Sequence, residues 1–221
     1  MEFEKVEIKG LVLCKPELIY DNRGFFSEIF RKDLFEKFIN KETEFCQSNT
    51  SESSYGTIRG LHFQAYPSSQ NKLVSVSKGE ILDVALDIRT SSNTYGKFYS
   101  VKLNDKNNFQ LYIPKGFAHG FSVLSKEARV QYQVDNFYDK KNEFGINPLD
   151  NNLGIDWKIN KENYQISSKD LNHPDFKNIN FFSFKYELLI VVISNSPLSL
   201  GSMYLEILIT LFGYIYKPTT A

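Results

Sequence analysis

The chain has 221 residues, which fits one domain or one domain with an appendage, because single sandwich and barrel domains often reach this length. Lys and Arg number 26 and so do Asp and Glu, so the overall charge argues against a nucleic-acid-binding or membrane-surface protein. With 42% hydrophobic residues the chain can bury a sizeable core, which argues against intrinsic disorder. An anionic ligand must therefore be met by a local group of cations.

The N-terminal residues, MEFEKVEIKG, alternate charged and apolar side chains and contain no uninterrupted apolar stretch. This pattern predicts a first strand and not a signal peptide. The two cysteines, Cys14 and Cys46, each stand alone, so the sequence offers neither a disulfide framework nor a CxxC metal motif. We therefore expect reduced cysteines and a cytoplasmic location.

One helix is predicted early in the chain, over Lys32 to Asn40. Leu34, Phe35 and Phe38 recur there at helical spacing. Asp33 is placed where its carboxylate can cap the helix.

Elsewhere, residues 1–182 show short alternating apolar runs split by Gly, Asn, Asp and Ser turns. In residues 72–89, KLVSVSKGEILDVALDIR, two such runs flank a Lys-Gly-Glu turn, and we expect a β-hairpin. Residues 96–114 show the same rhythm. Closely spaced strands with few helices predict an all-β protein, most economically a jelly roll with a few short helices.

Residues 183–221 change character and form an apolar C-terminal extension. The runs LLIVVI (188–193) and LEILITLFGYIY (205–216) are densely apolar, but neither reaches the roughly 18–20 residues that a membrane helix needs. No membrane span is expected. The extension is interpreted either as extra secondary structure that covers core or interface, or as a tail foreign to the domain.

Three histidines, His62, His119 and His173, limit the chemistry that can be proposed. A cupin metal site needs closely spaced histidines and an acid, whereas His62 has no histidine nearby in sequence and His173 is expected in a surface loop, so no metal is predicted. A histidine on an apolar strand can also be a hydrogen-bonded core residue. If His62 is functional, imidazole suits proton transfer, with Asp170 or Asp83 as the carboxylate that fixes its tautomer.

Two cations, Arg59 and Lys72, interrupt segments that otherwise look like strand cores. Such cations suit phosphate binding or stabilisation of an oxyanion. Surface ion pairs are the alternative interpretation.

Five segments together resemble the dTDP-4-dehydrorhamnose 3,5-epimerase family of metal-independent cupins, and the resemblance covers about residues 5–176. In chain order they are RGLHFQ (59–64), KLVSVSKGEILDVALDIR (72–89), TYGK (94–97), IPKGFAHGFSVL (113–124) and SSKD (167–170). Five motifs in family order are far more specific than any one alone.

The resemblance implies a jelly-roll homodimer that inverts C3 and C5 of a nucleotide-linked 4-keto-6-deoxy sugar without a cofactor. It implies that His62 is the base and Asp170 its orienting carboxylate, that Lys72 stabilises the enolate, and that Tyr132 is the acid on the opposite face. His119 is implied to lie beside the site, where it either hydrogen-bonds Asp83 or contacts the sugar.

The resemblance also implies a set of side chains that bind the nucleotide diphosphate sugar. Tyr138 is expected to stack on the base, and Arg59 and Lys169 are the natural diphosphate partners. The remaining binding positions are Arg23, Glu28, Gln47, Asn49 and Glu143.

One departure leaves the substrate open. Residues 145–150 read GINPLD, with Pro148 where the family usually has tryptophan, in a segment expected to shape the pocket. A dTDP-hexose in surface polysaccharide synthesis is the family default, and the alternatives are a GDP-linked heptose or inversion at a single centre. Two alternatives belong to other functional classes. A non-catalytic nucleotide-sugar-binding cupin would lack the base or the acid, but His62 and Tyr132 are both present. A 3,4-ketoisomerase is disfavoured because the RGLHFQ segment with Asp170 follows the epimerase pattern.

Overall fold

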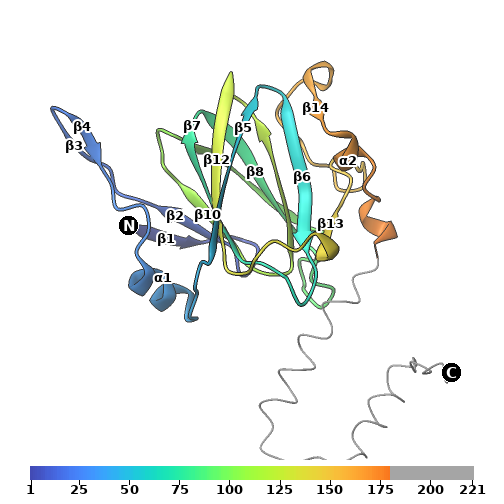
Figure 1. Cartoon of the computed structure of the whole chain (residues 1–221), viewed down its shortest axis with the longest axis horizontal. Helices are drawn as coiled ribbons and strands as arrows, with labels where there is room; N and C mark the ends of the chain where they lie inside the picture. The colour runs from blue at the N-terminus through green and yellow to red at the C-terminus, as the bar shows by residue number, and fades with distance from the viewer. Residues whose placement is uncertain (180–221) are drawn as a thin grey trace, which may run out of the picture. The chain divides into compact units, whose positions relative to one another are not determined.

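The computed structural model describes residues 1–179, which form two facing antiparallel sheets (Figure 1). The first sheet has the strand order β1 (Glu2–Lys5), β2 (Val12–Lys15), β10 (Gln110–Ile113), β7 (Lys72–Lys78), β12 (Glu127–Val134) and β5 (Gln47–Ser54). The second has the order β13 (Glu143–Gly145), β6 (Thr57–Gln64), β11 (Phe117–Val123), β8 (Glu80–Asp87) and β9 (Phe98–Asn104), and β14 (Gln165–Ile166) pairs in parallel with β6. The all-β jelly roll predicted from the sequence is confirmed.

Strands β7 and β8 belong to different sheets, which corrects the predicted hairpin over residues 72–89. Its two runs form β7 and β8 as expected, but β7 pairs with β10 and β12 while β8 pairs with β9 and β11. Gly79, with φ of +79°, carries the chain from one sheet to the other. Alternation and a turn signal specify two strands, but they do not specify that the strands hydrogen-bond to each other.

Apolar side chains from both sheets fill the space between them. Leu13, Val74 and Leu111 of the first sheet pack with Ile81 and Phe121 of the second. Strand β8 is buried along nearly its whole length, because it lies between β11 and β9 and is covered on both faces. Burial of this kind supplies the main favourable free energy of folding.

The first sheet is covered on its outer face by α1 (Lys32–Ile39), which confirms the predicted helix. Phe35 is fully buried, with its ring 5.0 Å from that of Tyr112. The expected cap is wrong: Arg31 occupies the N-cap position, and Asp33 lies in the first turn, where it accepts hydrogen bonds from the Arg31 side chain.

The outer face of the second sheet is covered by the segment after β13. Trp157 and Ile146 are fully buried there, and Trp157 Nε1 donates to the Pro148 carbonyl at 2.9 Å. This segment contains the short 3₁₀ helices η2 (Lys161–Asn163) and η3 (Phe176–Asn178), and the four-residue α2 (Ser168–Leu171). A third 3₁₀ helix, η1 (Lys140–Asn142), precedes β13.

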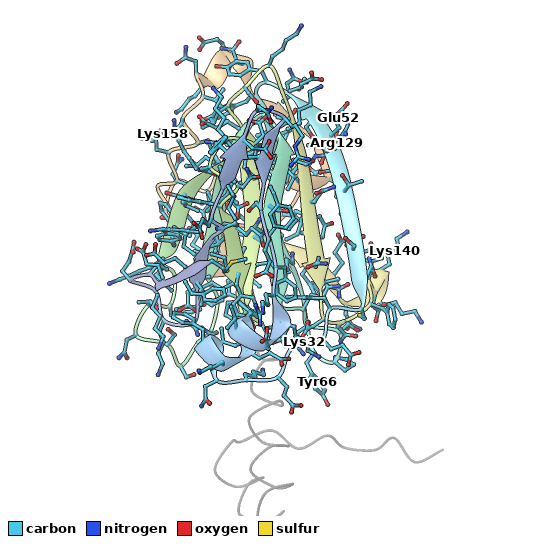
Figure 2. The ribbon with its side chains drawn as sticks, turned by 90° about the vertical axis from the view of Figure 1, so that its left-hand side faces the viewer. Lys32, Glu52, Tyr66, Arg129, Lys140 and Lys158 are labelled. Carbon is cyan, nitrogen blue, oxygen red and sulfur yellow. The ribbon has the colours of Figure 1, made fainter. Side chains whose placement is uncertain are left out.

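A small two-stranded arm, β3 (Ile19–Asp21) and β4 (Gly24–Phe26), projects away from the sandwich (Figure 1). Tyr20, Phe25 and Phe26 are each more than half exposed on it. In Figure 2, Lys32 and Tyr66 lie at one end of the sandwich, and the ion pair of Glu52 and Arg129 lies toward the other.

The apolar extension predicted at 183–221 lies outside the described residues, so the boundary near residue 182 stays a prediction. Among residues 1–179, no helix is long and apolar enough to cross a membrane.

Candidate active site

A cavity of about 620 Å³ opens between the two sheets near β5, β6 and β12. Its volume is in the range of small-molecule sites. Strand β5 explains its polar character, because alternate residues of this edge strand are half-buried and those at 47, 49 and 51 line the cavity. All but two of the predicted site residues line it: Gln47, Asn49, Arg59, His62, Lys72, His119, Tyr132, Tyr138, Glu143, Lys169 and Asp170.

His62, on β6, is paired with Asp170, on α2. His62 Nε2 lies 2.8 Å from Asp170 Oδ1, and the Gly60 amide donates to Oδ2 at 3.3 Å. Burial alone would raise the pKa of Asp170, but the hydrogen bonds from His62 and Gly60 outweigh it, so the pKa is lowered and the carboxylate stays charged. Of the two carboxylates expected to fix the His62 tautomer, Asp170 is therefore the partner.

The chain fixes both members of this pair locally. Asp170 is in the first turn of α2, and its amide donates to the Ser167 hydroxyl that caps the helix. On the other side, β6 approaches β11 closely enough that a Cβ on Gly60 would lie 2.5 Å from the Gly120 Cα. Gly60 also has φ of +114°, so only glycine suits this position beside His62.

Tyr132 faces the cavity from the other sheet, on β12. Burial is the main reason that the pKa of its phenol is raised, while Arg59 acts in the opposite direction. A raised pKa keeps the phenol protonated at neutral pH, as a proton donor must be. The cavity therefore has a histidine base candidate on one sheet and a phenol acid candidate on the other.

Lys72 begins β7, with Nζ 3.5 Å from the His62 carbonyl. Burial lowers the pKa of Lys72 to about 8, against the opposing attraction of Asp83 and Glu143. At neutral pH the ammonium is still mostly charged, and a desolvated cation beside the cavity can stabilise a developing oxyanion.

His119 hydrogen-bonds Asp83, which was one of the two expected roles. His119 Nε2 lies 2.7 Å from Asp83 Oδ1, and the Asp83 side chain is fully buried between β11 and β9. His119 also lines the cavity, so its ring is held in place at the cavity wall.

The exposed rim of the cavity is a hydrogen-bonded group around Glu143. Glu143 Oε2 accepts from Tyr138 Oη at 2.9 Å and from Lys169 Nζ at 2.6 Å. Burial raises the pKa of Glu143, but these two donors outweigh it and the pKa is lowered. The Tyr138 amide also donates to the Gln47 side chain at 3.0 Å, so this tyrosine is fixed through backbone and side chain.

The other rim cation is Arg59, whose Nε donates to the Ser53 hydroxyl at 2.9 Å. Arg59 also lines the cavity, where its guanidinium could donate hydrogen bonds to a ligand.

Arg23 and Glu28 do not reach this cavity. Arg23 is in the turn of the β3–β4 arm, where its side chain is 86% exposed and pairs with Asp21 at 2.6 Å. Glu28 follows the same arm and is exposed.

Two expectations about the histidines are wrong: His173 does not lie in an exposed surface loop, and His62 does have a histidine neighbour. Its ring lies 5.6 Å from that of His62, and its side chain is only 16% exposed. The signal was its spacing: three residues after Asp170, the chain leaving α2 turns back over that residue.

His62, Asp170 and His173 place one donor atom each within 4.8 Å of one another, a set that could hold a metal ion. Two ligands of one tetrahedral zinc lie about 3.3 Å apart. The 2.8 Å between His62 and Asp170 is instead the length of a charged hydrogen bond. The donor set therefore fits a histidine–carboxylate pair better than a zinc site.

Pro148 lies away from the active-site cavity, which corrects the expected effect of the GINPLD departure. It lines a separate hollow with Trp157 and Leu171, on the outer side of the second sheet. None of residues 145–150 lines the active-site cavity. This substitution is therefore no reason to doubt the family's usual substrate.

The fold and the cavity define a cupin-type jelly-roll protein with an acid–base site between its sheets. The family model for dTDP-4-dehydrorhamnose 3,5-epimerase matches residues 5–178. The chain belongs to this dTDP-4-dehydrorhamnose 3,5-epimerase family, as its motifs predict.

Individual relatives are similar to this chain along nearly their whole length. The dTDP-4-dehydrorhamnose 3,5-epimerase of Shigella flexneri is 44% identical over 182 residues, 82% of this chain and 99% of that protein. The crystal structure of the Elizabethkingia anophelis enzyme of that name has a TM-score of 0.79 and 43% identity, and covers 81% of this chain and 98% of that one. A Legionella pneumophila dTDP-6-deoxy-D-glucose-3,5-epimerase, crystallised with dTDP-4-keto-L-rhamnose, has a TM-score of 0.77 and 40% identity, covering 81% and 94%.

Proposed function

We propose that this protein is an isomerase that inverts C3 and C5 of dTDP-4-keto-6-deoxyglucose to give dTDP-4-keto-rhamnose. One observation carries the proposal: His62, paired with Asp170, and Tyr132 come from opposite sheets and line the same cavity. Inversion needs a base on one face of the sugar and an acid on the other, which this arrangement supplies.

The chemistry follows from the ketone at C4, which acidifies the hydrogens on C3 and C5. His62 takes one of these protons with the ring nitrogen that Asp170 does not engage, and Asp170 stabilises the imidazolium that forms. The electron pair moves onto the C4 oxygen, where the Lys72 ammonium stabilises the enolate. The electron pair then returns to carbon, which takes a proton from Tyr132 on the opposite face, and exchange with solvent removes the proton from His62 and restores that of Tyr132. No atom is oxidised or reduced overall, so the reaction requires no redox cofactor.

The rim residues suit the nucleotide diphosphate. Arg59 and Lys169 are the exposed cations that line the cavity, and charged donors make the stronger hydrogen bonds to phosphate oxygens. Tyr138 is fixed by Glu143 and Gln47 with its ring half exposed, so a base can stack on it. Asn49 and His119 complete the polar wall that faces the sugar.

Thymidine is preferred over guanosine for two reasons. The relatives described above carry dTDP in their names, and one was crystallised with a dTDP-sugar. In addition, Pro148, the residue that had left the substrate open, lies outside the cavity. Synthesis of surface polysaccharide in the cytoplasm is the setting that we expect for this reaction.

The exposed arm supports a homodimer in which Arg23 and Glu28 complete the partner's site. Three aromatic side chains on the arm are more than half exposed, and an apolar surface of this kind is usual at protein interfaces. Light scattering tests the dimer. Mixing Arg23→Ala with His62→Asn under exchange conditions tests the shared site, because one intact site per mixed dimer would restore activity. Restoration to no more than the sum of the separate variants would contradict it.

Proton NMR in deuterated water tests the reaction itself. With dTDP-4-keto-6-deoxyglucose, we expect loss of the C3 and C5 proton signals and appearance of the inverted product. Exchange only with a GDP-linked 4-keto-6-deoxy heptose would change the nucleotide and the sugar. Inversion at one carbon would make the enzyme a single-centre epimerase, and binding without exchange would make it a binding protein.

A further inference from the structure

The proposed chemistry leaves His173 without a role, although this residue lies against the base. Its Nε2 atom is buried and makes no hydrogen bond within residues 1–179. That atom lies 3.9 Å from Asp170 Oδ1, and the ring meets the His62 ring nearly edge-on, at 81°. A buried polar atom without a partner costs free energy, so its position needs an explanation.

The His173 ring fills a space that the backbone leaves open for it. A Cβ on Gly145, in β13, would lie 2.2 Å from His173 Nε2. Gly145 is also the residue directly opposite His62 in the pairing of β13 with β6. His173 does not line the cavity, so it touches His62 and Asp170 without reaching the substrate.

We infer that His173 is a positioning residue for the His62–Asp170 pair. Its ring holds the His62 imidazole in one orientation and covers the Asp170 carboxylate, so that water does not compete for the bond between them. The inference rests on the proposed function, since it concerns the base of that reaction.

Three features of the contact support a packing role. At 3.9 Å, His173 is too far from Asp170 for a hydrogen bond, so it does not draw the carboxylate away from His62. The Asp170 side chain is only 6% exposed, and part of its cover is the His173 ring. A shorter side chain at 173 would leave a polar gap in which a water molecule could bind the carboxylate.

Burial and the neighbouring charges favour the neutral form of His173. It faces His62 of β6, Asp170 and Lys169 of α2, and Glu143 of β13. Burial is the main cause that lowers its pKa, and His62 acts in the same direction, against the attraction of Asp170. A neutral ring can pack against the His62–Asp170 pair without adding a positive charge beside it.

Three variants separate this role from others. His173→Ala removes the ring, Gly145→Ala places a methyl group against the ring, and His173→Leu refills the space without a nitrogen. Asn172→Ala, at the exposed neighbour, is the matched control. Thermal unfolding confirms that each variant is folded before it is assayed.

We expect the rate of deuterium incorporation beside the ketone to fall about tenfold in His173→Ala and Gly145→Ala, because a misplacement of about 1 Å can cost up to about 100-fold. The Kd for dTDP should stay within about twofold in both, since His173 does not line the cavity. His173→Leu should recover most of the rate. The low-field proton resonance of the His62–Asp170 bond should persist in the Leu variant and broaden in the two Ala variants.

The inference is overturned if His173→Ala exchanges at the wild-type rate, or if its rate falls only in step with its affinity for dTDP. It is also overturned if the Leu variant is as slow as the Ala variant, because His173 would then act through its nitrogen. If the wild-type protein catalyses no exchange, the proposed function fails. The resonance of the His62–Asp170 bond in the free variants then still decides the positioning role.

Discussion

The sharpest consequence of the site concerns the charge on Lys72. Burial lowers its pKa to about 8, so about 90% of the ammonium is present at pH 7 and about 10% at pH 9. If the ammonium stabilises the enolate, kcat/KM should fall about tenfold between these pH values, because kcat/KM reports groups of the free enzyme. Tyr132 does not cause this fall, since its pKa is raised from 10.

The assay is initial rates of epimerisation between pH 6 and 10 for the wild type and Lys72→Arg. A guanidinium keeps its charge over this range, so the variant should be slower but should lose the fall near pH 8. Lys78→Arg is the control, because Lys78 is exposed on the same strand and pairs with Glu127. A wild-type profile that is flat to pH 9.5, or a fall near pH 8 that persists in Lys72→Arg, would refute the assignment.

Three further predictions concern the base, the acid and the core. Asp170→Asn should lower kcat by at least about 100-fold, because an amide cannot stabilise the imidazolium and can hold the wrong tautomer. Stopped-flow or NMR rates near the wild-type value would contradict a catalytic role for the His62–Asp170 pair. Tyr132→Phe should slow inversion about 100-fold or more while same-face deuterium exchange continues, and an unchanged ratio of inversion to exchange would remove Tyr132 as the acid. Phe35→Ala should lower the free energy of unfolding in urea by about 3–5 kcal/mol. The exposed Leu34→Ala should change it by less than about 0.5 kcal/mol, and equal effects would contradict the packing described for α1.

The strands were predictable because the pattern that defines them is local. Period-two alternation and turn residues mark β7, β8 and β9 in the sequence, and helical spacing marks α1 to within one residue. Partner choice is not local. Strands β7 and β8 follow each other in the chain and still join different sheets: β7 pairs with β10 and β12, and β8 pairs with β9 and β11. The cap of α1 was mistaken for a related reason: the Asp33 carboxylate pairs with Arg31 and not with backbone amides.

The site residues were predictable where they match a family motif. They were less predictable where contacts between distant parts of the chain determine which side chains are neighbours. The resemblance predicts His62, Lys72, Tyr132 and Asp170 as the catalytic group, and all four line one cavity. The residue pattern alone leaves Asp170 and Asp83 as alternative partners of His62, because both carboxylates lie far from it in sequence, and the structure pairs Asp170 with His62 and Asp83 with His119. His173 was missed because Asn-His-Pro-Asp looks like a surface loop until α2 folds it back onto His62.

The proposed mechanism depends most directly on His62 as the base. The decisive measurement is deuterium incorporation at C3 and C5 of dTDP-4-keto-6-deoxyglucose by proton NMR, for the wild type and His62→Asn at equal dTDP occupancy. We expect rapid incorporation at both carbons in the wild type and almost none in the variant, with the Kd for dTDP changed by no more than a few-fold. Incorporation by His62→Asn at a rate near that of the wild type would assign proton removal to another group and contradict the mechanism.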